Sequence, residues 1–492
     1  MNFSRRTFLR VGGGAALAAT AGCDPLPKSF LIGFQGKPER TGPFHPPASA
    51  SIDLVAHALN RLSFGPCPGD YARVKKLGGN EREALQNYVE EQLHPEKISD
   101  DWCDYSTRRF AETLNEPAGE LFEYQEKFLL SEMTREAILR AVLTERQLYE
   151  VMVQFWTDHF NIDPSKGDCR WLKASDDRLV ARHHALGNFP EMLRASALSP
   201  AMLWYLDGRV NRRDKPDDKP NENYARELLE LHTLGVHGGY TQRDVMEVAR
   251  CLTGWTVRSK EKLQIGKVEF HPARHDNGAK EVLGRRIPPG LGEKDLDRVL
   301  DLVALHPATA KHLATKLCRH FIADEPPASA VTAVAQAFTA SRGEIRPTLR
   351  ALFATEEFQT ARGTKFKRPF HFVVSALRAT AAETDAGEPV NDYLLRMGHA
   401  PFRYPTPDGY PEEASPWMGT LLWRWNFAVA LPGNKIKGTS VVLKALKQNL
   451  GGDEKLMAHF LGRLPTTEEI DSYHQSGAGL ALLLASPGFQ MC

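Results

Sequence analysis

Histidine and carboxylate side chains interrupt several otherwise apolar phrases of this sequence, and they are its best candidates for chemistry. The histidines are His159, His184, His232 and His275, and the carboxylates are Glu227, Glu230 and Asp276. Imidazoles and carboxylates are the groups that hydrolytic and oxidative metal centres use as ligands and proton carriers. The pattern favours an enzyme with a transition metal as candidate cofactor, although the sequence alone does not decide whether the chain is an enzyme.

The expected catalytic groups are the carboxylates and one histidine. Glu227 or Glu230 would act as a metal ligand or general base, and His275 with Asp276 would transfer protons. His275 and Asp276 precede a glycine turn, so an Asx-type turn capped by Asp276 is the structural alternative for that pair.

His159 and His232 are the expected metal ligands. His159 lies in the phrase FWTDHF, which begins at Phe155, where a neutral or metal-bound imidazole is favoured. A hydrogen-bonded core histidine is the alternative. Two known metal-binding motifs are excluded. Residues 234–240 contain no carboxylate, so they cannot form an EF-hand calcium loop. Glu230 and His232 are two positions apart, so they do not form the Glu-x-x-His motif of di-iron bundles. Without a CxxCH motif, a haem or redox role is the weakest option.

Two helices between residues 221 and 255 must position the glutamates. Asn221 is the expected N-cap of the first helix and Gly235 its C-terminal glycine. Thr241 with Asp244 predicts a capping box at the start of the second helix. The first helix is expected to present a charged face and an apolar stripe; the face comprises Arg226, Glu227, Glu230 and Thr233, and the stripe Tyr224, Leu228, Leu231 and Leu234.

The charged faces of these two helices have a structural alternative to a site. Arg226 and Arg250 would neutralise Glu227 and Glu230 in an ion-pair network between the helices. The arrangement of these four side chains in space decides between the two interpretations.

Helical spacing of apolar residues recurs along the rest of the chain, and it predicts a mainly α fold. The period changes between about residues 261 and 285, where Leu263, Ile265, Val268 and Phe270 indicate short strands. We therefore expect a multi-helix globular domain, residues 52–492, with a small β-ribbon insertion. A loop rich in Pro and aromatic residues, from Pro401 to Pro411, is of a kind that commonly borders a cleft.

The N-terminus carries an export signal. Residues 4–10, SRRTFLR, fit the twin-arginine pattern, and the apolar run Val11 to Gly22 is too short to span a bilayer. We expect residues 1–23 to be a signal read by the twin-arginine machinery, and residues 24–51 to be a Pro/Gly-rich tether.

Cys23 is a candidate lipidation site that would anchor the chain in the membrane; ordinary cleavage between Ala18 and Ala21 is the alternative. The expected location is the periplasm or the envelope.

The overall charge excludes one class of partner. With 62 basic and 61 acidic residues the net charge is +1, so the chain lacks the basic footprint of a nucleic-acid-binding protein. Cysteines are scattered without a CxxC pair, which leaves disulfide pairing undetermined.

Several phrases together resemble one bacterial family. They are HALNRLSFGP from His57, FWTDHF from Phe155, HALGNF from His184, NENYARELLELHTLGV from Asn221, YTQRDVMEVARCLTGW from Tyr240, PDGYP from Pro407 and the closing ASPGFQ. In this order they resemble the family of domain of unknown function 1800, with Tyr224 where leucine is usual. The resemblance implies an exported, mostly helical bacterial protein, and it implies no reaction. A non-catalytic, envelope-anchored binding or assembly protein is therefore the alternative to a metal-dependent enzyme.

Overall fold

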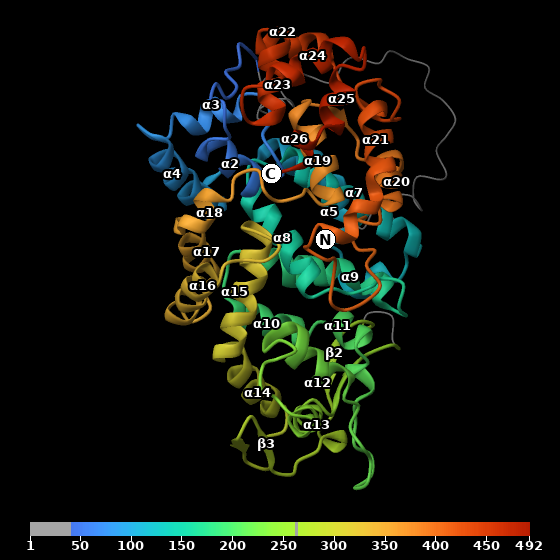
Figure 1. Cartoon of the computed structure of the whole chain (residues 1–492). Helices are drawn as coiled ribbons and strands as arrows, with labels where there is room; N and C mark the ends of the chain where they lie inside the picture. The colour runs from blue at the N-terminus through green and yellow to red at the C-terminus, as the bar shows by residue number, and fades with distance from the viewer. Residues whose placement is uncertain (1–40, 261–263) are drawn as a thin grey trace, which may run out of the picture. The chain divides into compact units, whose positions relative to one another are not determined.

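The structure is a computed structural model that describes residues 41–260 and 264–492. The expected signal, the start of the tether, Cys23 and Leu263 lie outside the described residues. The described residues belong to one structural unit (Figure 1). The fold is mainly α-helical with small β-ribbons, which confirms the predicted fold class.

The first part of the unit is a set of helices that ends with a largely buried helix, Gln147–His159. Asp53 caps the first of them by accepting a hydrogen bond from the backbone N–H of Ala56 at 2.8 Å. These helices are α2 Leu54–Arg61, α3 Asp70–Lys75, α4 Glu81–Leu93, η3 Pro95–Lys97, α5 Asp101–Leu114, α6 Ala118–Leu121, α7 Glu126–Leu143 and α8 Gln147–His159.

The middle part contains two π-helical segments. They are η4 Asp177–Arg182 and η6 Leu228–Thr233. The neighbouring helices are α9 Cys169–Asp176, α10 Phe189–Ala197, α11 Pro200–Tyr205, η5 Gly208–Val210, α12 Asn223–Glu227, α13 Gln242–Cys251, η7 Pro272–Arg274, α14 Lys294–Ala304 and α15 Pro307–Phe321. Single π turns inside helices are rare and often occur at functional sites.

The last part returns to regular helices. They are α16 Ala328–Ala340, α17 Ile345–Ala354, α18 Glu356–Thr360, α19 Pro369–Ala379, α20 Glu388–Arg396, η8 Ser415–Thr420, α21 Leu421–Ala430, α22 Leu443–Leu450, α23 Asp453–Leu461, α24 Thr467–Gln475, α25 Leu480–Ala485 and α26 Pro487–Gln490. No described helix has the length and apolar character needed to cross a membrane.

The strands described in the structure form two-stranded antiparallel ribbons. They pair β1 Trp255–Val257 with β2 Val268–Phe270, β3 Lys280–Val282 with β4 Arg285–Ile287, and β5 Glu383–Thr384 with β6 Thr439–Ser440. The expected ribbon at about residues 261–285 thus corresponds to two ribbons. Ile265 lies in the turn that joins β1 to β2 and is not part of a strand.

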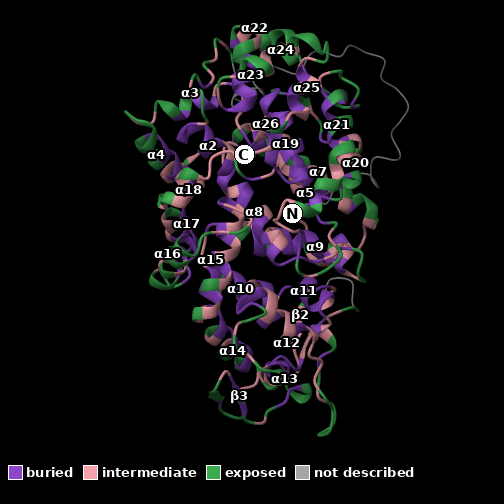
Figure 2. Cartoon of the chain, in the orientation of Figure 1, coloured by how far each residue is buried: buried purple, intermediate pink, exposed green. Residues whose placement is uncertain are grey.

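The core surrounds α8. Trp156 on this helix is the largest fully buried side chain, and its indole N–H donates to the carbonyl of Ala185 at 3.0 Å. Figure 2 shows buried residues concentrated along α8, α9 and α19, with exposed residues on the outer helices. The C-terminal end of α8 therefore lies where several elements meet.

The helix pair expected between residues 221 and 255 differs from an ideal α-helical pair in two ways. The first helix starts at Asn223, because Asn221 uses its side chain to accept from the Asn223 backbone in a turn. The π segment η6 then adds a residue to the turn, and Thr233, expected on the charged face, is buried. The predicted capping box of Thr241 and Asp244 is present at the start of α13.

Candidate functional site

The structure brings the two predicted metal ligands together. His159 ends α8 and His232 lies in η6, and their ring centroids are 6.2 Å apart. The Nε2 of His159 is 3.2 Å from the backbone carbonyl of His232, and the Nζ of Lys316 is 3.0 Å from its Nδ1. Burial lowers the pKa of His159 well below its usual value, and the charge of Lys316 adds to the effect. The imidazole is therefore neutral, with Nε2 donating and Nδ1 accepting.

His232 has a different environment. Its side chain is fully buried, and neither ring nitrogen has a hydrogen-bond partner among the described residues. Burial lowers its pKa to about 3. The hydroxyl of Tyr224, whose ring centroid is 6.4 Å from that of His232, also lacks a partner within the described chain. Buried polar groups without partners are uncommon, and an ordered water is their usual partner.

A metal ion fits this pair of histidines poorly. The lone pair of His159 that could coordinate already accepts a hydrogen bond from the Lys316 ammonium group. Across residues 41–260 and 264–492, no three His, Cys, Asp or Glu side chains are grouped so that they could hold a metal ion. The donor set supports hydrogen bonding at His159 better than coordination.

Glu227 and Glu230 are half-buried, and their expected arginine partners are engaged elsewhere. The Tyr240 hydroxyl donates to Glu230 at 3.2 Å, whereas the side chain of Glu227 makes no hydrogen bond with the described residues. Burial, followed by the neighbouring charge of Glu230, raises the pKa of Glu227.

The arginines expected to neutralise these glutamates pair with other acids. Arg226 is 3.0 Å from Glu222, and Arg250 is 2.9 Å from Glu247. The ion-pair network predicted as the structural alternative is therefore not formed.

His275 lies in a separate buried cluster. Its Nε2 is 2.9 Å from Asp295, its Nδ1 is 2.8 Å from the carbonyl of Thr253, and Lys280 contacts the same Asp295 carboxylate at 2.5 Å. This cluster joins the β3–β4 ribbon to the start of α14. It makes no hydrogen bond with His159, His232 or the two glutamates.

Asp276 belongs to the same ribbon region. It forms ion pairs of 2.8 Å with Arg250 and Arg213. Burial alone would raise its pKa, but the hydrogen bonds from Arg250 and the nearby charges lower it. Its side chain also accepts from the backbone N–H of Gly278, as expected for an Asx turn.

His184 is the last of the four candidate histidines. Its ring packs edge-on against that of His183, with the ring centroids 4.6 Å apart.

Asp158, which precedes His159 in the chain, is a functional candidate that the sequence reasoning missed. Its carboxylate accepts from Arg368 at 3.0 Å, and Arg368 is 3.3 Å from Glu412. Glu412 is in turn 2.7 Å from the Nδ1 of His320. This series of polar contacts connects α8, α15, the start of α19 and the loop after Tyr410. The position of Asp158 inside the phrase FWTDHF was the signal that could have identified it, but apolar neighbours usually mark a core residue.

Asp158 has the electrostatic properties of an acid–base group. Burial raises its pKa to about 6; the charge of Arg368 opposes this shift and that of Glu412 adds to it. The Asp158 side chain is still 14% exposed, and among the described residues only one of its oxygens has a hydrogen-bond partner. Burial also lowers the pKa of nearby Lys316 to about 8. Such shifts are common at catalytic sites.

A small cavity borders Asp158; we call it the inner cavity. It has a volume of about 40 Å³, enough for one water molecule, and His399 and Tyr410 also line it. Tyr410 belongs to the PDGYP phrase, and Gly409 of that phrase is required by the packing. A Cβ atom at Gly409 would overlap the backbone carbonyl of Asp158, and the φ of +75° also favours glycine.

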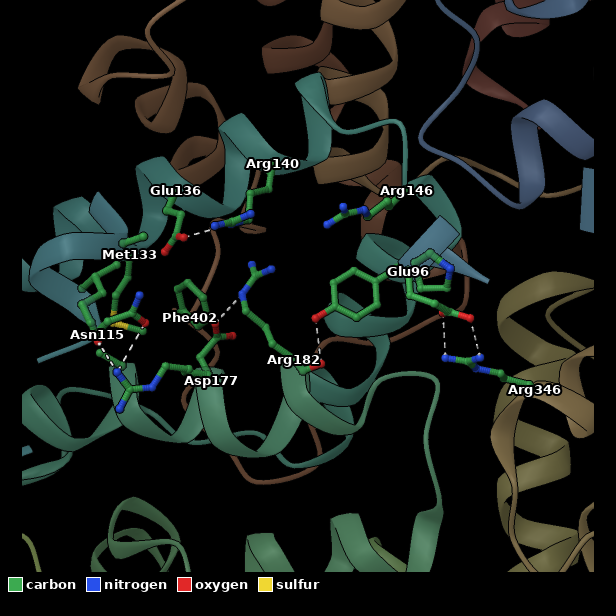
Figure 3. A pocket seen from close by; sticks show the side chains of 16 residues that line it. Glu96, Asn115, Met133, Glu136, Arg140, Arg146, Asp177, Arg182, Arg346 and Phe402 are labelled. Atoms are coloured by element: carbon green, nitrogen blue, oxygen red, sulfur yellow. Dashed lines mark hydrogen bonds and ion pairs between the residues drawn. The ribbon is translucent and has the colours of Figure 1, made fainter. Parts of the chain in front are cut away.

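A larger pocket of about 450 Å³ adjoins the inner cavity; we call it the outer pocket (Figure 3). Asp177, Arg182 and Phe402 line both spaces. Its wall includes the arginines Arg140, Arg146, Arg178, Arg182 and Arg346 and the acids Glu96, Glu136 and Asp177. This volume is within the range of small-molecule sites. These arginines were not predicted, because charged helix residues usually face solvent.

The π segment η4 shapes one wall of the outer pocket. Asp177 and Arg182, five residues apart, form an ion pair of 2.8 Å across this turn. Hydrogen bonds in a π-helix join residues five apart, so such a pair can share one face. The segment thereby points Arg182 toward α7, from which Arg140 approaches (Figure 3).

Comparison with known proteins identifies one family. The family described as "Protein of unknown function (DUF1800)" has a sequence model that matches residues 57–491. No curated protein and no solved structure matches the chain.

Proposed function

The chain belongs to the DUF1800 family, and we propose that it is an enzyme in which Asp158 acts as a general base. The observation that carries the proposal is a desolvated carboxyl group beside a cavity that adjoins a pocket of small-molecule size. Asp158 has a pKa raised to about 6 and borders the inner cavity. A base with a pKa near the working pH is the most effective proton acceptor.

The proposed chemistry is proton abstraction at the inner cavity. A substrate enters the outer pocket, and its acidic group, or a water molecule beside it, reaches Asp158. The carboxylate oxygen that is not bonded to Arg368 accepts the proton, and the positive charge of Arg368 holds the other oxygen in place. Tyr410 and His399 shape the cavity. The hydroxyl of Tyr410 already donates to the carbonyl of Ala400 at 2.7 Å, which makes it a positioning residue.

The residues predicted from the sequence enter this proposal in different ways. His159 would set the position of Lys316, whose charge acts on Asp158. Glu227 and Glu230 stay candidates for a second proton-transfer step, since the side chain of Glu227 makes no hydrogen bond with the described residues. We assign no chemical step to His275 and Asp276.

The transition-metal hypothesis for His159 and His232 has a direct test. Elemental analysis of protein purified from the periplasm would show a stoichiometric metal if it is correct, and replacing both histidines would remove that metal.

Replacement of Asp158 tests the proposed base. Chromogenic esters, phosphoesters and glycosides are screened with the wild-type chain, with Asp158→Asn and with Asp217→Asn, an exposed control. We expect Asp158→Asn to lower kcat/KM by 10²-fold or more on any substrate turned over, in line with the usual contribution of a general base. Because the base must be deprotonated, wild-type kcat/KM rises as pH increases through about 6. Full activity of Asp158→Asn, or activity that falls through that pH range, would contradict the proposal.

We also propose that the chain is exported by the twin-arginine route to the periplasm or envelope. The support is the phrase Ser4 to Arg10 and the apolar run that follows it. Replacement of Arg5 and Arg6 by lysine is expected to retain the precursor in the cytoplasm. Processing blocked by globomycin would support lipidation at Cys23, and unaltered processing would support ordinary cleavage.

A binding or assembly role is the second candidate function, and one surface favours it. Helix α21 and the preceding turn expose Met418, Leu422, Trp425 and Val429, which are 53–67% accessible and spaced as one helical stripe. The only charged residue of α21, Arg424, is buried. Exposed apolar stripes often mark protein interfaces. If Leu422→Ser/Trp425→Ser abolishes biological function while Asp158→Asn preserves it, the assembly role is the better description.

A further inference from the structure

We propose that the outer pocket binds an oxyanion group of the substrate, a carboxylate or phosphate, through Arg146 and Arg178. The inference rests on the proposed function, since it takes the outer pocket as the place where the substrate of Asp158 is held. The arginines of the pocket wall differ in whether a carboxylate already neutralises them.

Three of the wall arginines are neutralised by carboxylates. Arg182 is bonded by both oxygens of Glu150, at 2.8 and 3.0 Å, and also by Asp177. Arg346 forms a forked pair with Glu96 at the rim, at 3.3 and 3.2 Å. Arg140 binds Glu136 at 2.9 Å. These groups are therefore poor candidates to bind a ligand charge.

Arg146 and Arg178 are the wall arginines whose hydrogen bonds with the described residues involve no carboxylate. Arg146 uses its Nε on the carbonyl of Ile98, and its nearest carboxylate, Asp104, is 3.9 Å away and half exposed to solvent. Among the described residues, Arg178 donates only to neutral oxygens, the carbonyl of Leu114 at 3.5 Å and the amide of Asn115 at 3.3 Å. A guanidinium group with free donors binds carboxylate or phosphate well, because its planar fork matches two oxygens.

The wall between these arginines suits a ligand with an apolar body. Leu114, Met133 and Phe402 contribute apolar surface. In Figure 3, Arg140 and Arg146 approach the space from α7 and the residues that follow it, and Arg182 approaches from the opposite side. A ligand that is charged at one end and apolar along its length fits this lining.

Phe402 is shared by the walls of the outer pocket and the inner cavity, and its backbone is strained. Its φ of +61° lies in the left-handed region, which is costly for an aromatic residue and common at functional sites. The side chain lines both spaces. A substrate anchored at Arg146 and Arg178 would therefore extend past Phe402 toward Asp158.

Calorimetric titration with two probes, inorganic phosphate and succinate, tests the inference at constant ionic strength. We expect the mature wild-type chain to bind at least one probe. Arg146→Gln and Arg178→Gln should each weaken that binding 10-fold or more, because each removes charge-assisted hydrogen bonds. Arg108→Gln is the matched control, since Arg108 is 70% exposed and lies outside the pocket wall. Thermal unfolding of each variant separates lost binding from lost folding, and Arg146→Lys keeps the charge if the glutamine variant is unstable.

The outcomes separate this inference from the proposed base. Binding of phosphate alone, or of succinate alone, supports the inference and identifies the anion. The inference is overturned if the wild-type chain binds neither probe, or if both glutamine variants bind the probe as tightly as the wild type does. Asp158→Asn is expected to bind the probe as the wild type does. If Asp158→Asn is inactive and the wild-type chain binds neither probe, only the base proposal stands. If Asp158→Asn is active and the wild-type chain binds a probe as expected, only the anion site stands.

Discussion

At the scale of single residues, burial decides which titratable groups can do chemistry. Asp158 and Asp276 are both carboxylates near arginines, but burial raises the pKa of Asp158 to about 6, whereas hydrogen bonds from Arg250 lower that of Asp276. A carboxylate held by two arginines is stabilised in its charged form and is a weak base. Asp158 is the better proton acceptor for this reason.

His232 gives a prediction at the same scale. Its ring nitrogens are buried without partners among the described residues, so their burial costs stability. Replacement by leucine, which removes both polar atoms, should leave the free energy of unfolding at pH 7 unchanged or raise it by about 1 kcal/mol. Urea unfolding measures this difference, with His183→Leu as the exposed control. A loss of more than about 2 kcal/mol would instead indicate a bound partner for His232, such as a water molecule or metal ion.

At the scale of elements, short motifs place long-range partners. The capping box of Thr241 and Asp244 starts α13, and the same Asp244 accepts from the backbone of Leu283 in the ribbon at 2.7 Å. Both π segments change which residues face inward: η4 directs Arg182 into the outer pocket and η6 buries His232 and Thr233. The site thus depends on local departures from ideal α-helix.

The PDGYP loop gives a prediction for an element. Gly409→Ala would place a methyl group against the backbone carbonyl of Asp158, in a conformation that alanine rarely adopts. We expect a loss of about 2 kcal/mol or more in the free energy of unfolding, together with reduced activity, because the loop must move away from α8. Gly419→Ala is the control, since a Cβ there meets no atom within 4 Å. Equal melting temperatures for the two variants would show that the loop does not pack on Asp158.

At the scale of the whole molecule, buried histidines make the folded state sensitive to acid. Burial lowers the pKa of His232 to about 3 and that of His312 to about 4, and it holds those of His159, His371 and His399 well below the usual 6.5. Below pH 6.5 the unfolded chain therefore binds more protons than the folded chain, and stability falls as pH falls.

Acid titration measures this effect. The urea midpoint should decrease steadily from pH 7 to pH 4.5, and the decrease should be steeper in Asp158→Asn. The raised pKa of Asp158 works in the opposite direction, because its protonation below about pH 6 favours the folded state. A midpoint that stays constant over this range would mean that the histidines are accessible to protons in the folded chain.

The helical fold class, the family and the local caps could be predicted from the amino-acid sequence. The fold class and the caps depend on residues three or four positions apart, and the family resemblance is carried by longer phrases such as the one that begins at Asn221. The Thr241–Asp244 box and the helix-ending Gly235 could be predicted for that reason. The sequence also predicted a metal site at His159 and His232, but it did not show that their rings would lie 6.2 Å apart.

The surroundings of the candidate residues depend on the tertiary fold. Asp158 and Arg368 are 210 positions apart, and the arginine wall is assembled from segments between Glu96 and Phe402. Such contacts arise from packing of the whole chain, and no local spacing encodes them. The pKa of a carboxyl group depends in turn on that packing, because desolvation and nearby charges come from elements distant in the sequence.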